Sequence, residues 1–123
     1  MGNIQSMKKI SFQDMNYCIN NNYIIITVIN DTNCLIKGTI SIHEEEDVIN
    51  NMYSNNNLID PIIIYGRNSC DEKIIEKYKQ LTNLGFKNIY VYPGGLFEWL
   101  LLQDIYTNNN FKTTNNELNL LKY

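Results

Sequence analysis

Two short runs of almost purely apolar residues constrain the fold of this chain more than any other feature. Residues 23–29 and 61–65 consist mainly of isoleucine and other β-branched or aromatic residues, so both faces of each run are apolar. Strands of this kind are typical of a parallel sheet that helices cover on both sides. Neither run approaches the roughly 18 apolar residues that a membrane-spanning helix needs. The sequence therefore predicts buried strands in a layered domain.

Amphipathic segments between the strands predict the helices. Residues 71–84 place apolar side chains three and four positions apart, and Gly85 follows as a residue that commonly ends a helix. Residues 43–51 carry acids at positions 44–47, which favour a helix start, and residues 96–105 predict a short apolar helix. With residues 87–92 as a further strand, the alternation predicts an α/β fold, a three-layer sandwich with a mainly parallel central sheet and helices on both faces.

The two ends of the chain differ from this middle portion. Residues 1–10 predict a flexible tail, and Ser11 predicts the cap of a short helical turn. Residues 35–42 predict a turn that leads into another short strand. Residues 107–123 are rich in asparagine, and we expect a frayed C-terminal tail there. The expected domain therefore spans residues 11–106.

Charge and cysteine content exclude several function classes. The formal net charge is -3 and the sequence pI is about 5.0, so no broad positive field favours nucleic-acid binding. The cysteines Cys18, Cys34 and Cys70 form no close pair, which predicts reduced thiols and a cytoplasmic location. The only histidine is His43, so the sequence offers no Cys–His metal spacing and predicts no metal or other cofactor.

The first residues match an acylation signal. Gly2 becomes the N-terminal residue once Met1 is removed, and Ser6 stands at the position that N-myristoylation favours. Lys8 and Lys9 follow, as a basic pair beside an acyl chain suits an anionic membrane surface. The pattern predicts myristoylation of Gly2 and peripheral membrane association, with a chance Met-Gly start as the alternative.

Three segments in the second half follow one another in a recognisable order. An apolar strand ends in Tyr65-Gly66, a strand begins with Gly85-Phe86-Lys87-Asn88-Ile89, and a turn leads into a helix with Gly94-Gly95-Leu96-Phe97-Glu98-Trp99. This order resembles the rhodanese homology domain, whose corresponding segments are Tyr-Cys, Gly-Phe-x-Asn-Val and Gly-Gly-x-x-x-Trp. Residues 35–40 match more loosely, where the family has His-Ile-Pro-Gly-Ala-Ile. The resemblance implies a rhodanese-like three-layer sandwich.

The resemblance also implies where a site would lie. In the family a cysteine thiolate opens a loop whose backbone N–H groups converge on an anion, and these groups and the following helix favour the thiolate and a persulfide. Here the corresponding loop begins with Gly66, and Thr27 and Ile29 stand where the family usually has an acid and an arginine. The implied binding loop consists of Gly66, Arg67, Asn68, Ser69, Cys70 and Asp71.

Three residues of this loop have chemistry of their own. Cys70 lies just before the predicted helix and is a candidate displaced nucleophile, with a small helix-start residue as the alternative. Arg67 is the only arginine and could bind a sulfate, phosphate or carboxylate, or be a solvated surface charge. Asp71 opposes an anion in the loop and could cap the helix. A related phosphatase needs a cysteine at the start of the loop and an arginine at its end, and neither is present.

These residues leave alternative functions. The first is a catalytically inactive rhodanese-like module, a pseudoenzyme that binds or regulates a protein partner. The second is an atypical thiosulfate sulfurtransferase or persulfide carrier that uses Cys70. The third is a domain that senses a small anion at the loop near Arg67.

Overall fold

The computed structural model describes residues 7–31, 33–106, 110–115, 117 and 119–123. Its core is a sheet of four strands in the order β1-β4-β3-β2. All neighbouring strands run parallel, with Ile62 of β3 paired to Ile24 of β2 on one side and to Ile89 of β4 on the other. The strands β1, β2, β3 and β4 are Lys8–Lys9, Ile24–Thr27, Ile62–Tyr65 and Ile89–Tyr92. The predicted parallel sheet is confirmed.

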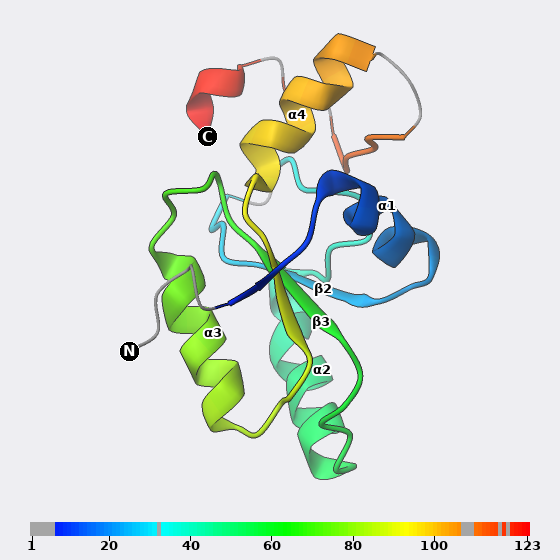
Figure 1. The fold of residues 1–123 in the computed structure, drawn as a ribbon, viewed down its shortest axis with the longest axis vertical. Helices are drawn as coiled ribbons and strands as arrows, with labels where there is room; N and C mark the ends of the chain where they lie inside the picture. Colours follow the sequence, from blue (N-terminus) through cyan, green and yellow to red (C-terminus); the bar gives the residue numbers. More distant parts are fainter. Residues whose placement is uncertain (1–6, 32, 107–109, 116, 118) are drawn as a thin grey trace.

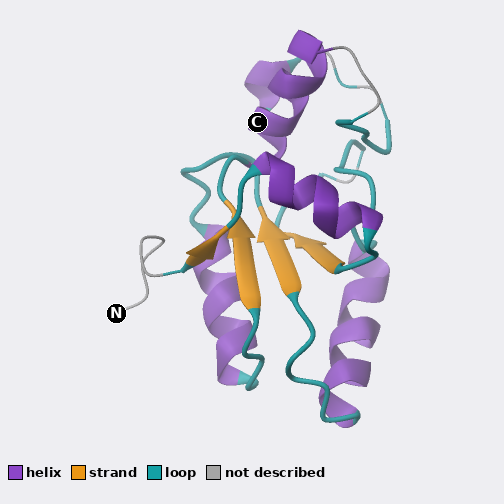
Figure 2. Ribbon diagram, turned by 45° about the vertical axis from the view of Figure 1, so that its right-hand side comes forward, coloured by secondary structure: helices purple, strands orange, loops and turns teal. Residues whose placement is uncertain are grey.

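Helices cover both faces of this sheet (Figures 1 and 2). Side chains that alternate along the strands divide the core, because successive strand residues point to opposite faces. Ile25 and Ile63 pack with α1 (Phe12–Asn20) and α4 (Gly95–Tyr106), whereas Ile26 and Ile64 pack with α2 (Ile42–Ser54) and α3 (Lys73–Asn83). The predicted α/β three-layer sandwich is therefore the observed architecture.

Local sequence signals set the ends of the helices. Ser11 caps α1 and forms a capping box with Asp14, and Ser41 accepts a hydrogen bond at the start of α2. Gly85 follows α3 with φ +102°, a conformation that favours glycine. The helix predicted from residue 71 begins two residues later, because the Asp71 side chain accepts a hydrogen bond from the Lys73 N–H.

The expected flexible tail over residues 1–10 is wrong for its described part. Lys8–Lys9 form the edge strand β1, Met7 is buried, and the Ile10 N–H donates to the Val91 carbonyl at 2.9 Å. The expected strand within residues 35–42 is also wrong. Only isolated bridges occur there, because Gly38 adopts φ +95° and turns the backbone away from an extended path.

The C-terminal segment packs against the domain instead of fraying, as far as it is described. Phe111 is buried and lies against Trp99 of α4, with ring centroids 5.2 Å apart. The Lys112 carbonyl accepts hydrogen bonds from the Trp99 indole N–H and the Lys37 N–H, each at 3.0 Å. A short 3₁₀ helix, η2 (Leu120–Lys122), follows and packs against α4.

Candidate functional site

The loop over residues 66–71 leaves the carboxyl end of β3 and leads to α3, which is where ligands bind in open parallel sheets. The start of α4 holds this loop in place. The Leu96 N–H donates to the Gly66 carbonyl at 3.0 Å, and the Phe97 N–H donates to the Arg67 carbonyl at 2.9 Å. Gly95 permits this approach, since it has φ +66° and an added Cβ would lie 2.5 Å from the Gly66 carbonyl oxygen.

The space that a side chain at position 66 would occupy is already filled by Asp71. A Cβ added to Gly66 would lie 2.6 Å from Oδ2, 2.9 Å from Cγ and 3.0 Å from Cβ of Asp71. The φ of Gly66 is not positive, so its backbone conformation is open to other residues. The Asp71 side chain, and not the backbone, therefore excludes a larger residue at position 66.

The Asp71 carboxylate accepts hydrogen bonds from backbone N–H groups in and beside the loop. Its Oδ2 accepts from the Arg67 N–H at 3.0 Å, and its Oδ1 accepts from the Lys73 N–H at 3.2 Å. The side chain is only 6% exposed. A further backbone N–H of the loop, that of Cys70, donates to the Asn68 side-chain Oδ1 at 2.8 Å. Side chains of the loop itself thus satisfy three backbone donors in and beside it.

Cys70 and Arg67 are both exposed to solvent beside this filled centre. Cys70 is an exposed free thiol, in contrast to Cys18 and Cys34, which are buried. Burial raises the pKa of the Cys18 and Cys34 thiols, which disfavours their nucleophilic thiolate forms. The Arg67 side chain is 58% exposed, and its Nε lies 3.9 Å from Asp71 Oδ2.

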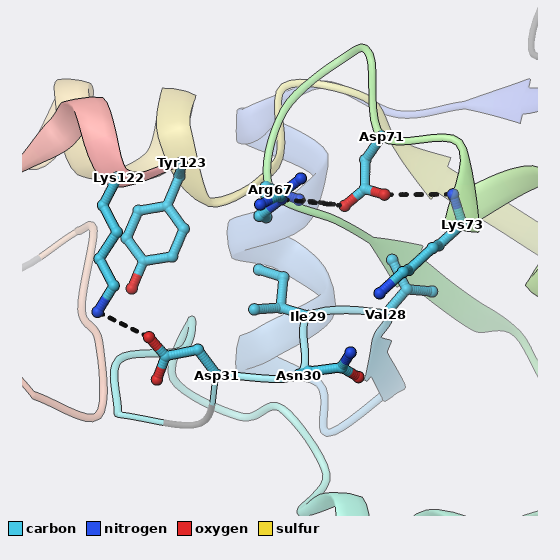
Figure 3. Close-up of a pocket in the computed structure, with 9 residues that line it drawn as sticks. All are labelled: Val28, Ile29, Asn30, Asp31, Arg67, Asp71, Lys73, Lys122 and Tyr123. Atoms are coloured by element: carbon cyan, nitrogen blue, oxygen red, sulfur yellow. Dashed lines mark hydrogen bonds and ion pairs between the residues drawn. The ribbon is translucent and has the colours of Figure 1, made fainter.

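Two hollows flank the loop. On the Arg67 side, a cavity of about 350 Å³ lies between the loop, the segment after β2 and the C-terminal segment (Figure 3). On the Cys70 side, a more apolar groove of about 640 Å³ runs along Phe97 and Leu101 of α4. Tyr123 lines both hollows and thus separates them.

The C-terminal segment contacts both the loop and the segment after β2. The Asn68 side-chain N–H donates to the Tyr123 carbonyl at 3.2 Å. Lys122 Nζ lies 2.7 Å from Asp31 Oδ2, and this contact lowers the pKa of the Asp31 carboxyl and raises that of the Lys122 amine. Sequence reasoning missed Lys122 and Tyr123, because an asparagine-rich segment gives no signal that it packs against a loop more than 50 residues away.

A comparison with protein-family models matches residues 16–102 to the rhodanese-like domain. The chain belongs to the rhodanese-like family. A crystal structure of the Alr3790 protein from Anabaena sp. is similar in fold to this rhodanese-like domain, with a TM-score of 0.62 and 17% identity over 92% of this chain and 97% of that one. A solution NMR structure of the rhodanese-like domain of the same Anabaena protein gives a TM-score of 0.58 and 19% identity over 76% of this chain and 74% of that one. No curated protein matches the chain.

Other residues singled out from the sequence have structural roles in this rhodanese-like domain. Thr27 is buried, and its hydroxyl donates to the Tyr65 carbonyl at 3.3 Å and accepts from the Ile29 N–H at 3.1 Å. Ile29 is buried and lines the cavity on the Arg67 side. His43 is exposed at the start of α2, where its N–H donates to the Ser41 hydroxyl. Neither Thr27 nor Ile29 supplies a charge to the loop.

The remaining site predictions concern metals and membranes. Within the described ranges, no three His, Cys, Asp or Glu side chains group as a metal site requires. Gly2 lies outside the described residues, so its acylation stays a prediction. None of the described helices is long and apolar enough to span a bilayer.

Proposed function

We propose that this rhodanese-like domain is catalytically inactive and acts as a binding or regulatory module. The observation that carries the proposal is the pair Gly66 and Asp71. A sulfur relay at the start of the loop needs a thiolate there and free N–H groups around it. Position 66 offers no side chain, and the Asp71 carboxylate accepts the hydrogen bonds of Arg67 and Lys73 instead.

Thiosulfate:cyanide sulfurtransferase turnover of the purified protein tests this proposal, together with intact-mass detection of an added sulfur. We expect no turnover and no added mass in a protein whose thermal unfolding shows it to be folded. Turnover by the wild type that is lost in Cys70→Ser and kept in Cys18→Ser would overturn the proposal, because Cys18 is a buried thiol and serves as the matched control.

A second candidate is a persulfide carrier that uses Cys70. The supporting observation is that this thiol is exposed and lines the groove beside Phe97. Its thiolate would attack the outer sulfur of thiosulfate, forming an S–S bond as sulfite leaves with the electron pair of the broken bond. Cyanide would then remove that sulfur as thiocyanate. Added mass of one sulfur at Cys70 after thiosulfate treatment would favour this function over the first.

Acylation of Gly2 is a further part of the proposal. It would place the domain at a cytoplasmic membrane surface, and the support is the N-terminal pattern together with the exposed side chains of Lys8 and Lys9 on β1. Metabolic labelling with an alkyne-bearing myristate tests it in cells that express the full chain. Label on the wild type but not on Gly2→Ala is the expected result, and an unlabelled wild type would contradict acylation.

A further inference from the structure

The helix α4 is more apolar than its packing in the domain requires. Its side chains Leu96, Trp99 and Leu100 are buried in the core. A helix that is apolar all round is normally covered on all sides. Here Leu101 is 36% exposed and Ile105 is 60% exposed, on a helix that extends past the carboxyl ends of β3 and β4 (Figure 1). One side of α4 therefore presents apolar side chains to solvent.

This side is a stripe that begins in the groove on the Cys70 side. Because an α-helix has 3.6 residues per turn, Phe97, Leu101 and Ile105 follow one another along the same side of α4. Phe97 and Leu101 line the groove of about 640 Å³, together with Cys70 of the loop and Pro93 after β4. The stripe covers about 12 Å of helix length. Such a surface suits the apolar face of a partner helix, whose side chains have the same spacing.

Two carboxylates border the stripe, and α4 contains no lysine or arginine. Helical geometry places Glu98 along one edge and Asp104 along the other. Glu98 also lines the groove, where its Oε1 accepts a hydrogen bond from the Tyr92 hydroxyl at 2.6 Å. Within the described ranges, neither carboxylate has a cation at ion-pair distance. Both edges of the stripe are therefore negative.

These charges distinguish between possible occupants. If two copies of this chain packed through α4, the acids of one helix would face those of the other, and such like-charge contacts are unfavourable. An anionic membrane surface is opposed for the same reason. A partner helix with cations on both sides of an apolar stripe would meet each carboxylate with the opposite charge.

We propose that the groove and the stripe dock a basic amphipathic helix of a partner protein. Apolar side chains of that helix enter the groove beside Phe97 and cover Ile105, and its lysine or arginine side chains pair with Glu98 and Asp104. The inference rests on the proposed binding role and gives it a class of partner.

Isothermal titration calorimetry of the folded full chain with a synthetic peptide tests the proposal. The probe has about 15 residues, with leucine at every third or fourth position and lysine on both sides of the leucine stripe. The control peptide has glutamate in place of every lysine. We expect the lysine peptide to bind at least about tenfold more tightly than the glutamate peptide.

Variants of the apolar stripe locate the binding. Ile105→Gln should weaken binding of the lysine peptide about fivefold, because an apolar contact is lost. Ile59→Gln is the matched control, since Ile59 is an exposed isoleucine between α2 and β3, and it should bind the peptide as the wild type does.

A second variant tests the charges. Glu98→Gln combined with Asp104→Asn removes both carboxylates and keeps an oxygen acceptor for the Tyr92 hydroxyl. This double variant should weaken binding of the lysine peptide about fivefold and reduce its dependence on salt. Asp47→Asn, an exposed position on α2, should leave the affinity and the salt dependence unchanged.

Equal affinity for the two peptides, or unchanged binding in Ile105→Gln, would overturn the proposal. Dimer formation in sedimentation that Ile105→Gln abolishes would assign the stripe to a second copy of the chain. Adsorption to phosphatidylserine vesicles that the same variant abolishes would assign it to a membrane, and either result overturns the partner helix. Absence of peptide binding without turnover refutes only this docking surface, whereas sulfurtransferase turnover refutes the proposed inactive function whatever the titration shows.

Discussion

The filled space beside Gly66 makes a quantitative prediction for a double-mutant cycle of Gly66→Ala and Asp71→Gly. An alanine Cβ at position 66 would lie 2.6 Å from Asp71 Oδ2, well inside van der Waals contact. The side chain of Asp71 can relieve this overlap only by leaving the Arg67 and Lys73 N–H groups. Gly66→Ala therefore removes two hydrogen bonds to a carboxylate without changing either donor.

The magnitude follows from those lost bonds. A hydrogen bond to a charged group contributes about 1.5–3 kcal/mol, and part of this is recovered because water reaches the freed loop amides. We therefore expect Gly66→Ala to lower the free energy of unfolding by about 2–4 kcal/mol. Asp71→Gly alone should cost about 1–3 kcal/mol, mainly through the lost hydrogen bonds from the Arg67 and Lys73 N–H groups. Once Asp71 is absent, the Gly66→Ala substitution should cost less than about 1 kcal/mol, because φ of Gly66 is not positive.

Urea unfolding followed by far-ultraviolet circular dichroism measures all four corners of this cycle. The expected coupling free energy between the two positions is at least about 1.5 kcal/mol, with the double variant more stable than additivity allows. Additive effects would refute the reasoning, because the Asp71 carboxylate would then not occupy the space beside position 66. Asp47→Gly, an exposed position in the first half of α2, serves as the control for a lost carboxylate without this contact.

Other parts of the structure lead to further expectations. Gly95→Ala should lower the unfolding free energy by more than about 3 kcal/mol, because φ of Gly95 is +66° and the added Cβ would meet the backbone of the loop at 2.5 Å. Urea unfolding measures this loss, and a value below about 1 kcal/mol would contradict the close approach. Phe111→Ala should cost about 3–5 kcal/mol if the C-terminal segment belongs to the core, whereas a frayed tail would make the same substitution neutral in thermal unfolding. Burial raises the pKa of Tyr65 to about 12, so the folded state keeps a proton that the unfolded chain releases near pH 10. The contribution of Tyr65 to stability should thus be full below about pH 10 and should fall by about 1.4 kcal/mol per pH unit between about pH 10 and pH 12. Tyr65→Phe should make the pH dependence of the unfolding free energy shallower in this range. An unchanged slope in that variant would refute the assignment.

The sequence predicted most of the layered fold because its main strands carry strong local signals. The isoleucine-rich runs that became β2 and β3 are apolar on both faces, and such strands fit few arrangements other than a covered parallel sheet. The strand β1 carried no such signal. It is a pair of exposed lysines at a sheet edge, and only its pairing with β4 makes it a strand.

The candidate site was predictable in its location but not in its contents. The segment order placed the loop over residues 66–71. Asp71 stands one residue before Glu72, the N-cap of α3, and accepts a hydrogen bond from the Lys73 N–H there. That its carboxylate fills the space beside Gly66 depends on the turn of the loop in three dimensions, which residue types do not specify. The cavity wall formed by Tyr123 depends on the contact of Tyr123 with Asn68 and that of Lys122 with Asp31, and both partners lie far away in sequence.

The contact between positions 66 and 71 also restricts the order in which this loop can change during evolution. A cysteine that arises at position 66 while Asp71 is present overlaps the carboxylate and yields a less stable chain. A small residue at position 71 removes this overlap beforehand, so the path with the smallest loss of stability to a thiol at the start of the loop takes two substitutions, with position 71 changing first. Among related sequences, side chains larger than glycine at position 66 should therefore occur together with small residues at position 71.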